Sequence, residues 1–176
     1  MDASLALSLN KFALHFKWIL PLLSDWMVFI VFALGALWIF MHHIGRYKAI
    51  AIDFIFTMAF PIAASVVISE TLSKIFDRAR PFVADKQIVL LIPHDPDGGF
   101  PSHHTTVMVA IAVALWYRNH NLGRNLFILS IISGIARVGA GIHYPTDILA
   151  GAVIGAATSW VLHKNLKHLR LRFLSK

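Results

Sequence analysis

Long stretches of uncharged, apolar residues limit what this chain can fold into. A helix needs about 20 predominantly apolar residues to cross the hydrocarbon core of a bilayer. The sequence contains five candidate segments, at residues 26–44, 49–73, 101–117, 125–142 and 145–163. It therefore predicts an all-α integral membrane bundle of about five transmembrane helices.

The composition supports this prediction. Of the 176 residues, 57% are hydrophobic and 14% are charged, whereas an ordinary soluble domain carries roughly 25% charged residues. A chain of this size has too little interior to bury so much apolar surface, which leaves the bilayer to take it up. The length allows a single domain over residues 1–176, and the absence of cysteine excludes disulfides and thiol chemistry.

The N-terminal segment is expected to form an amphipathic helix at the membrane interface. Leu5, Leu9, Phe12 and Phe16 would share one side of that helix and could rest on lipid. A cleaved signal peptide is not expected, because Asp2 stands where a basic start is usual and lysines interrupt the apolar run.

Basic residues predict the orientation of the spans. Nine of the sixteen lysines and arginines lie in two turns and in the C-terminal tail, which five crossings place on one face. They are Arg46, Lys48, Arg118, Arg124, Lys164, Lys167, Arg170, Arg172 and Lys176. The positive-inside rule makes this face cytoplasmic, so the net charge of +7 indicates topology and attraction to anionic lipid rather than nucleic acid. The loops over residues 74–100 and 141–146 should then meet at the outer face.

Three cations lie close together in the first of these loops. Lys74, Arg78 and Arg80 fall within seven residues and end at Pro81, which stops a helix. Arginine offers a planar fork of donors that fits phosphate oxygens, and cations on the outer face run against the positive-inside rule. The structural alternative is a basic helix end that complements its own dipole and the lipid head groups.

A second motif is the run Gly-Gly-Phe-Pro-Ser-His-His-Thr-Thr that starts at Gly98. Pro101 suits the first position of a helix, whose unpaired amides would form an anion cradle. Ser102 could donate a hydroxyl hydrogen bond, and His104 could protonate a departing oxygen. The structural alternative makes Ser102 a helix N-cap beside interfacial histidines.

A third motif joins the last two spans. Asp147 should lie in the first turn after Pro145, where it can turn back toward His143. It would hold one imidazole nitrogen protonated and leave the other free to attack, while Arg137 would neutralise a nearby anion. The structural alternative makes Asp147 a favourable acid at a helix start and His143 an interfacial ring. Gly151 and Gly155 share one face of the last span and permit close helix packing.

A zinc site is the chemical alternative to a phosphate site. The four side chains that could ligate zinc are His103, His104, His143 and Asp147. The surrounding arginines would repel a dication and fit a phosphate better, so neither a metal nor another cofactor is expected.

Together, the three motifs resemble those of the type-2 phosphatidic acid phosphatase superfamily. The matching residues are Arg80-Pro81, Pro101-Ser102-x-His104, and Arg137 followed by His143 and Asp147. Four stretches resemble most the bacitracin-resistance undecaprenyl-diphosphate phosphatases of bacteria. They are Arg-Pro-Phe-Val-Ala from Arg80, Leu-Ile-Pro-His from Leu91, Phe-Pro-Ser-x-His-Thr-Thr from Phe100, and His-Tyr-Pro from His143.

The resemblance implies metal-independent hydrolysis of a lipid diphosphate through a phosphohistidine. His143 would attack the terminal phosphorus, and Asp147 would orient this ring and stabilise its positive charge. His104 would protonate the leaving lipid phosphate and then assist water. The residues implied to hold the phosphoryl oxygens are Arg80, Arg137 and Ser102.

Two positions depart from the family pattern. The pattern places six residues between its lysine and Arg-Pro, whereas Lys74 has five before Arg80, so either Lys74 or Arg78 could supply the first cation. The third motif usually begins Ser-Arg, but Ala136 precedes Arg137 here, which removes one hydroxyl donor.

The expected function is hydrolysis of undecaprenyl diphosphate to undecaprenyl phosphate and inorganic phosphate, which recycles the lipid carrier of cell-wall synthesis. The expected location is the bacterial plasma membrane with the site facing outward, and the expected partners are the polyprenyl diphosphate lipid and the bilayer. A phosphatase for phosphatidylglycerophosphate or phosphatidic acid is the alternative enzyme, because the same groups would serve either substrate. An anion channel or transporter is the alternative class, yet Arg137 and Asp53 are nearly alone as charges within the spans.

Overall fold

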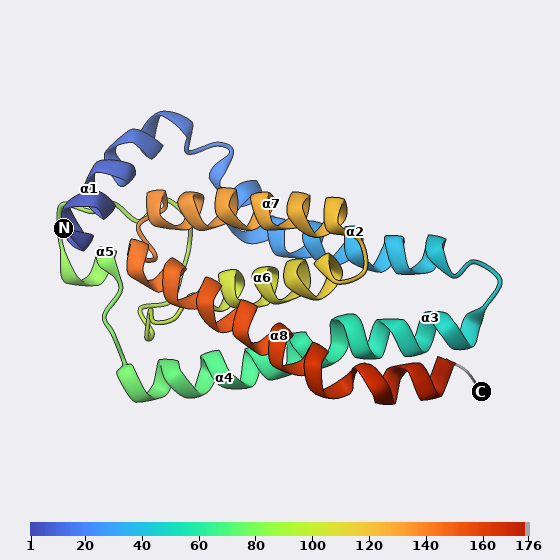
Figure 1. Cartoon of the computed structure of the whole chain (residues 1–176). Coiled ribbons are helices and arrows are strands. Elements are labelled where there is room, and N and C mark those ends of the chain that lie inside the picture. The colour runs from blue at the N-terminus through green and yellow to red at the C-terminus, as the bar shows by residue number, and fades with distance from the viewer. Residues whose placement is uncertain (175–176) are drawn as a thin grey trace.

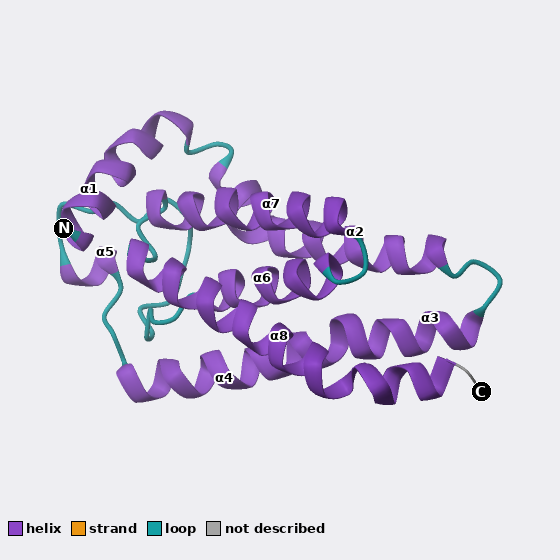
Figure 2. Ribbon diagram, viewed as in Figure 1, coloured by secondary structure: helices purple, strands orange, loops and turns teal. Residues whose placement is uncertain are grey.

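The computed structural model describes residues 1–174, and in that range it contains helices and loops without a β-strand (Figures 1 and 2). The helices are α1 (Asp2–Ala13), α2 (Met27–His42), α3 (Tyr47–Phe54), α4 (Phe60–Phe76), α5 (Pro81–Ala84), α6 (His103–Trp116), α7 (His120–Gly139) and α8 (Pro145–Leu174). A 3-10 turn (Leu14–Phe16) follows α1, and π-helical turns precede α2 (Leu22–Trp26) and join α3 to α4 (Ile55–Ala59). The all-α prediction is confirmed.

Within the described residues, four helical stretches are long and apolar enough to cross a membrane. They cover Leu22–His42, Tyr47–Ala84, His120–Gly139 and Pro145–Leu174. The remaining segment expected to span, at residues 101–117, forms α6, which has 14 residues and is roughly 21 Å long, shorter than a bilayer core. Helix α6 packs against α8, α7, α4 and α2, and most of its side chains are buried. It is apolar because it forms the centre of the bundle, which hydropathy alone does not distinguish from lipid contact.

Close packing of α8 on α6 brings the beginnings of the two helices together. A Cβ atom on Gly155 would collide with the backbone of Thr106, and one on Gly151 would lie 2.8 Å from the carbonyl oxygen of Ser102. The backbone N–H of Ser102 donates to the carbonyl oxygen of Asp147 over 3.1 Å. The two glycines permit the close packing that their helical spacing predicts, and this packing brings the second and third motifs side by side.

Helix α1 is attached to the bundle by a buried polar residue. The side-chain amide of Asn10 donates to the carbonyl oxygens of Val89 and Gly139, both over 2.8 Å, and its oxygen accepts from the N–H of Val89 over 2.9 Å. Phe12 and Phe16, on the side expected to rest on lipid, are exposed. The helix therefore presents its apolar side outward while Asn10 ties its other side to the loop before α6 and the end of α7.

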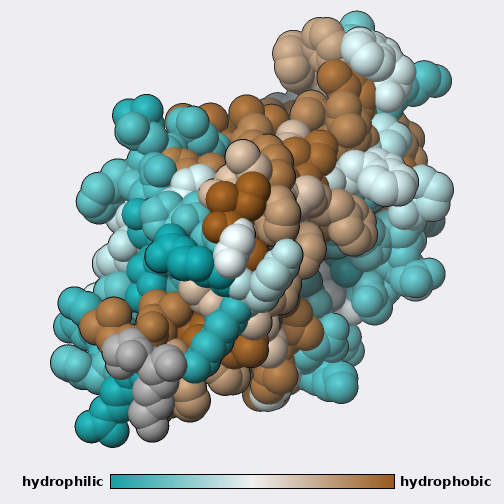
Figure 3. Space-filling model, turned by 90° about the vertical axis from the view of Figure 1, so that its right-hand side faces the viewer, coloured by the Kyte–Doolittle hydropathy of each residue, from teal (hydrophilic) through white to brown (hydrophobic). Residues whose placement is uncertain are grey.

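The two ends of the bundle differ in their connections. Helices α4 and α7 end where α6 and α8 begin, beside α5 and the long loop that follows it (Figure 1). The other end carries the α2–α3 and α6–α7 turns and the end of α8 (Figure 1). Figure 3 faces this second end, where hydrophilic residues gather near the C-terminus and border a hydrophobic band.

Candidate active site

The two loops predicted to meet enclose a pocket at the first end of the bundle. The pocket has a volume of about 200 Å³. Its lining residues come from the end of α4, the loop around α5, the start of α6, the end of α7 and the α7–α8 loop. They are Glu70, Arg80, His94, Asp97, Gly98, His103, His104, Arg137 and His143. Segments distant in sequence thus meet in one pocket, which contains the imidazole of His143.

The partners of His143 define its tautomer. Its Nδ1 atom lies 2.8 Å from the carbonyl oxygen of Gly99, and a carbonyl can only accept a hydrogen bond, so Nδ1 carries the proton. The Nε2 atom is thereby left with a lone pair, 3.5 Å from Nη1 of Arg80 and 3.4 Å from Nη2 of Arg137. Burial, followed by the positive charges of Arg137 and Arg80, lowers the pKa of His143 well below its usual value. The ring is therefore neutral at neutral pH, as a nucleophile must be.

The two guanidinium groups beside His143 are buried and held from behind. Arg80 is 5% exposed, and its Nε and Nη2 atoms donate to one oxygen of Asp97 over 3.0 and 2.7 Å. Arg137 is 2% exposed, and its Nη1 atom donates to the carbonyl oxygen of Ser24 over 3.2 Å and lies 3.3 Å from Asp25. Two cations fixed at one imidazole form a site in which a phosphoryl group can be bound by charge-assisted hydrogen bonds.

Asp147 lies beside His143 but does not hold it in the expected way. Its Oδ2 atom is 3.7 Å from Nδ1 of His143 and accepts the backbone N–H of Tyr144 over 2.7 Å. Its Oδ1 atom accepts from Nη1 of Arg78 over 2.6 Å. The carbonyl of Gly99 accepts the hydrogen bond from Nδ1 that was expected to go to this carboxylate. The sequence did not predict this contact, because a backbone acceptor from a remote loop leaves no sign in the pattern of side chains. Asp147 contributes a nearby negative charge and fixes the turn that carries His143.

Of the cations in the first motif, Arg80 alone lines the pocket within the described residues. Lys74 is exposed. Arg78 binds Asp147, and its Nη2 atom also donates to Asp2 over 2.7 Å. Burial alone would raise the pKa of Asp2, but hydrogen bonds from Thr146 and Arg78 outweigh it and lower this pKa. Arg78 is therefore placed as a tie between α1 and the start of α8, away from the pocket.

The second motif places one of its two expected residues in the pocket. His104 lines it from the first turn of α6. Ser102 is fully buried and does not line it, and its hydroxyl accepts from Thr105 over 3.1 Å. Ser102 stands at the N-cap position of α6, although its side chain makes no capping hydrogen bond. The hydroxyl is thus turned into the helix start rather than toward His143.

Several pocket residues were missed from the sequence. Asp97 and His94 line the pocket from the loop between the first two motifs. Asp25, in the turn before α2, was also missed; it contacts Arg137 but does not line the pocket. Burial and the charge of Arg80 lower the pKa of His94. His103, which the sequence suggested only as a candidate zinc ligand, lies 3.3 Å from Glu70 of α4. The run His-Asp-Pro-Asp-Gly-Gly from His94 to Gly99 was the signal available, because it leads directly into the second motif.

In the part of the chain that the structure describes, no three His, Asp or Glu side chains are grouped as a metal site would require. The strongest local charges at the imidazole are the two arginines. The donor set of this pocket is therefore suited to an oxyanion.

Comparison with known proteins agrees with this geometry. Residues 51–170 match the PAP2 superfamily, and the chain belongs to that superfamily. Undecaprenyl-diphosphatase BcrC of Bacillus subtilis is 40% identical over 91 residues, which cover 52% of this chain and 47% of that protein. The chain spans about half the length of the curated relatives it matches.

Solved structures show the same fold. LpxE of Aquifex aeolicus has a TM-score of 0.70 at 22% identity, covering 93% of this chain and 94% of that one. A PAP2-type phosphatidylglycerolphosphate phosphatase of Bacillus subtilis has a TM-score of 0.60 at 19% identity, covering 94% of this chain and 86% of that one. The family resemblance read from the three motifs is confirmed, as is the membrane-bundle fold class.

Proposed function

We propose that this chain is a membrane lipid phosphatase that hydrolyses undecaprenyl diphosphate through a phosphohistidine at His143. The observation that carries the proposal is the Nε2 lone pair of His143, held between the guanidinium groups of Arg80 and Arg137. A neutral nucleophile between two fixed cations suits attack on phosphorus, because the cations neutralise the oxygens as charge shifts in the transition state.

The reaction would run in two displacements. His143 Nε2 forms a bond to the terminal phosphorus while the bond from phosphorus to the bridging oxygen breaks, and His104 gives its proton to that oxygen. The imidazolium is stabilised by the hydrogen bond from Nδ1 to Gly99 and by the charge of Asp147, 3.7 Å away. In the second displacement, His104 accepts a proton from a water molecule as the oxygen of that water attacks phosphorus. The bond from phosphorus to Nε2 of His143 breaks, which releases inorganic phosphate and free His143.

The remaining expected ligands have different parts in this proposal. Arg80 and Arg137 bind the phosphoryl oxygens directly. Arg78 and Lys74 are not needed at the phosphate, since neither lines the pocket within the described residues. Ser102 contributes through the start of α6, where its backbone N–H is bonded to Asp147.

A lipid diphosphate is favoured as the substrate by two observations. Two apolar grooves of about 450 and 470 Å³ run beside α1 and α7, and the first of them reaches Val138 and Pro145 next to the site. A polyprenyl chain could lie in such a groove while its diphosphate enters the pocket. The name of the Bacillus subtilis relative, undecaprenyl-diphosphatase, supports the same substrate class.

We place the chain in a bacterial plasma membrane with this site facing outward. Arg46, Lys48, Arg118 and Arg124 lie in turns at the opposite end of the bundle, which the positive-inside rule assigns to the cytoplasm. The product would then be formed on the side where lipid-carried cell-wall precursors are used.

Phosphatidylglycerophosphate is the second candidate substrate. The fold shared with the Bacillus subtilis phosphatidylglycerolphosphate phosphatase favours it, and the same three groups at phosphorus would serve. Phosphatidic acid is the related glycerolipid alternative.

The test compares phosphate release by the purified protein from undecaprenyl diphosphate, phosphatidylglycerophosphate and phosphatidic acid in the same detergent micelles. We expect the highest kcat/KM for the diphosphate, and release from a glycerolipid alone would overturn the substrate assignment. Activity should survive EDTA, whereas inactivation by the chelator would favour the zinc alternative.

Labelled phosphate should be trapped on His143 after rapid acid-free denaturation, and labelling elsewhere would overturn the mechanism.

A further inference from the structure

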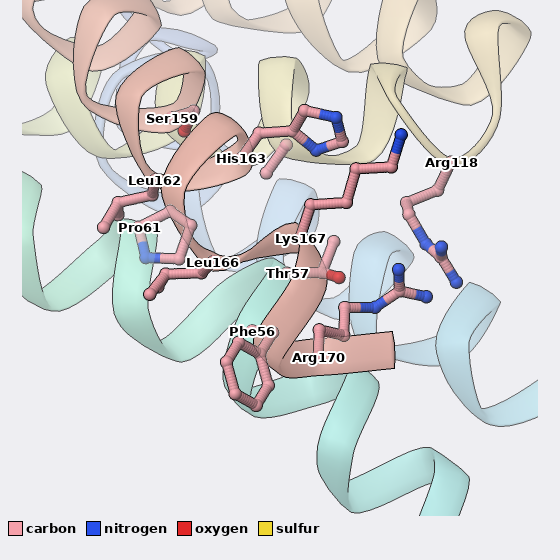
Figure 4. A pocket seen from close by; sticks show the side chains of 11 residues that line it. Phe56, Thr57, Pro61, Arg118, Ser159, Leu162, His163, Leu166, Lys167 and Arg170 are labelled. Atoms are coloured by element: carbon pink, nitrogen blue, oxygen red, sulfur yellow. The ribbon is translucent and has the colours of Figure 1, made fainter. Parts of the chain in front are cut away.

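A second polar pocket lies at the other end of the bundle (Figure 4). It is formed by the turn between α3 and α4, by the end of α6 and by the second half of α8. Its charged or titratable lining residues are Arg118, His163, Lys167 and Arg170. Lys167 is 22 residues beyond Pro145 on α8, roughly 33 Å along the helix, so this pocket is separated from His143 by about the thickness of a membrane.

One carboxylate already occupies the interior of this basic cluster. Asp53 is 0% exposed and accepts from Nη2 of Arg118, from Nε of Arg170 and from Nε2 of His43, each over 2.6 Å. Three elements distant in sequence therefore converge on a single oxyanion. The cluster is built to bind negatively charged oxygen, and Asp53 uses the inward-facing donors.

Positive charge remains after Asp53 is counted. Arg118 and Arg170 share that one carboxylate, and Lys167 has no acidic partner among residues 1–174. Figure 4 shows the ends of Lys167, Arg118 and Arg170 on the same side of the pocket. Cations gathered at low dielectric attract an anion more strongly than the same cations dispersed in water, so a second oxyanion at the mouth would be stabilised.

The opposite side of the pocket is apolar. Pro61, Leu162, Leu166 and Phe56 lie on that side, away from the charged ends (Figure 4). The room inside is about 30 Å³, close to the share of one water molecule, so an anion would sit at the mouth rather than deeper. A ligand with a phosphate end and an apolar body would match both sides.

We propose that this pocket binds the phosphate group of a membrane phospholipid, with the phosphate at Lys167, Arg118 and Arg170 and the first carbons of an acyl chain along Leu162 and Phe56. Free inorganic phosphate presents the same oxygens and is the other possible source of the ligand. The site is distinct from the pocket at His143 and lies at the end of the bundle where basic turns meet anionic head groups.

The experiment measures the thermal midpoint of the purified chain in dodecyl maltoside micelles. Increasing mole fractions of phosphatidylglycerol, or of diacylglycerol with the same chains, are added to the micelles, and inorganic phosphate is titrated separately. The variant is Lys167→Gln. Lys164→Gln is the matched control, because Lys164 lies on the same helix with its ammonium 4.1 Å from the ring of Trp160 and outside the pocket. Both substitutions remove one positive charge, so general attraction to anionic micelles falls equally.

We expect phosphatidylglycerol to raise the midpoint in a saturable way, with diacylglycerol inactive. Lys167→Gln should raise the half-saturating mole fraction about fivefold or more, as expected for one lost charge-assisted contact, while Lys164→Gln should match the unsubstituted chain. A Lys167-dependent shift with inorganic phosphate alone would assign the pocket to the free ion. Equal responses of all three proteins to phosphatidylglycerol, or an equal effect of diacylglycerol, would overturn the proposal. The readout does not depend on hydrolysis at His143.

Discussion

The two ends of this molecule hold oxyanions and cations in opposite ways. At the active-site end, Arg80 and Arg137 are buried while their carboxylate partners, Asp97 and Asp25, are 67% and 42% exposed at the side chain. At the other end, the carboxylate of Asp53 is fully buried, and its cations surround it. Partners at the surface can exchange with an incoming phosphate, whereas a carboxylate sealed inside cannot. The first end is therefore suited to turnover and the second to permanent cross-linking of the bundle.

The largest effect is expected from removing the nucleophile. His143→Ala should lower phosphate release from undecaprenyl diphosphate by about 10⁴-fold or more, because it removes the Nε2 lone pair that lies between the two guanidinium groups. Steady-state phosphate assays on purified, monodisperse protein would measure this loss. His15→Ala, at an exposed ring outside the pocket, is the matched control and should keep full activity. Near-normal turnover in His143→Ala would remove the basis of the proposed mechanism.

A large effect on stability, rather than on chemistry, is expected from Asp53→Asn. It would leave Arg118 and Arg170 without a counter-ion in a buried setting, which costs about 3 kcal/mol. Thermal midpoints in detergent would report it. Asp97→Asn makes the same change to the exposed carboxylate at the active-site end. If both variants lowered the thermal midpoint equally, the proposed difference between the two ends would be wrong.

The pH dependence should distinguish the active-site imidazole from an ordinary histidine. Protonation of Nε2 removes the attacking lone pair, and burial together with Arg137 and Arg80 lowers the pKa of His143. The kcat/KM, which reports the free enzyme, should therefore stay high as pH falls through 6.5 and decline only at lower pH. Arg80→Gln removes one positive charge, so the pKa of His143 should rise. The decline of kcat/KM at acidic pH, the acidic limb of the pH profile, should then move to higher pH. A limb that stays in place in this variant would show that Arg80 does not act on the ring.

The same shift predicts the direction of a stability change. The unfolded chain binds a proton at His143 near its usual pKa, whereas the folded chain does so only at lower pH. The contribution of this pKa difference to the free energy of unfolding is thus complete above about pH 6.5, and it declines as pH falls below that value. Thermal midpoints measured between neutral and acidic pH should fall for the unsubstituted chain more steeply than for His143→Gln, which cannot titrate.

The smallest effect is expected from Asp97→Asn. The asparagine oxygen can still accept from Arg80, and the pair is largely exposed on the carboxylate side, so stability should change by at most about 1 kcal/mol. Because phosphate would no longer compete with a negative charge for Arg80, KM should fall while kcat changes little. A rise in KM would indicate that Asp97 helps to bind the substrate.

The helical segments and the pocket-forming loops could be predicted because hydropathy and charge are local properties of the sequence. The positions of Arg80, His104, Arg137 and His143 in one pocket followed from their placement at the outer ends of helices. The central, shorter character of α6 could not be predicted, since burial among helices and contact with lipid both select apolar residues.

Two contacts at the site were also beyond sequence reasoning. The carbonyl of Gly99 accepts the hydrogen bond from Nδ1 of His143, and the segment around Ser24 supports Arg137. Any residue can supply a backbone carbonyl, so neither contact leaves a pattern in the residue types. The role of Arg78 as a partner of Asp2 and Asp147 depends on how α1 docks, which is likewise a property of the assembled bundle.

By itself, the sequence determined the class of fold, the number of apolar segments and the residue types available for phosphate chemistry, because each depends on chemistry read along the chain. The tertiary structure decided which of those residues share a pocket, which nitrogen of His143 is free, and which carboxylates are sealed or exposed. These depend on distances between segments that can lie more than a hundred residues apart, and such distances are set only when the helices pack.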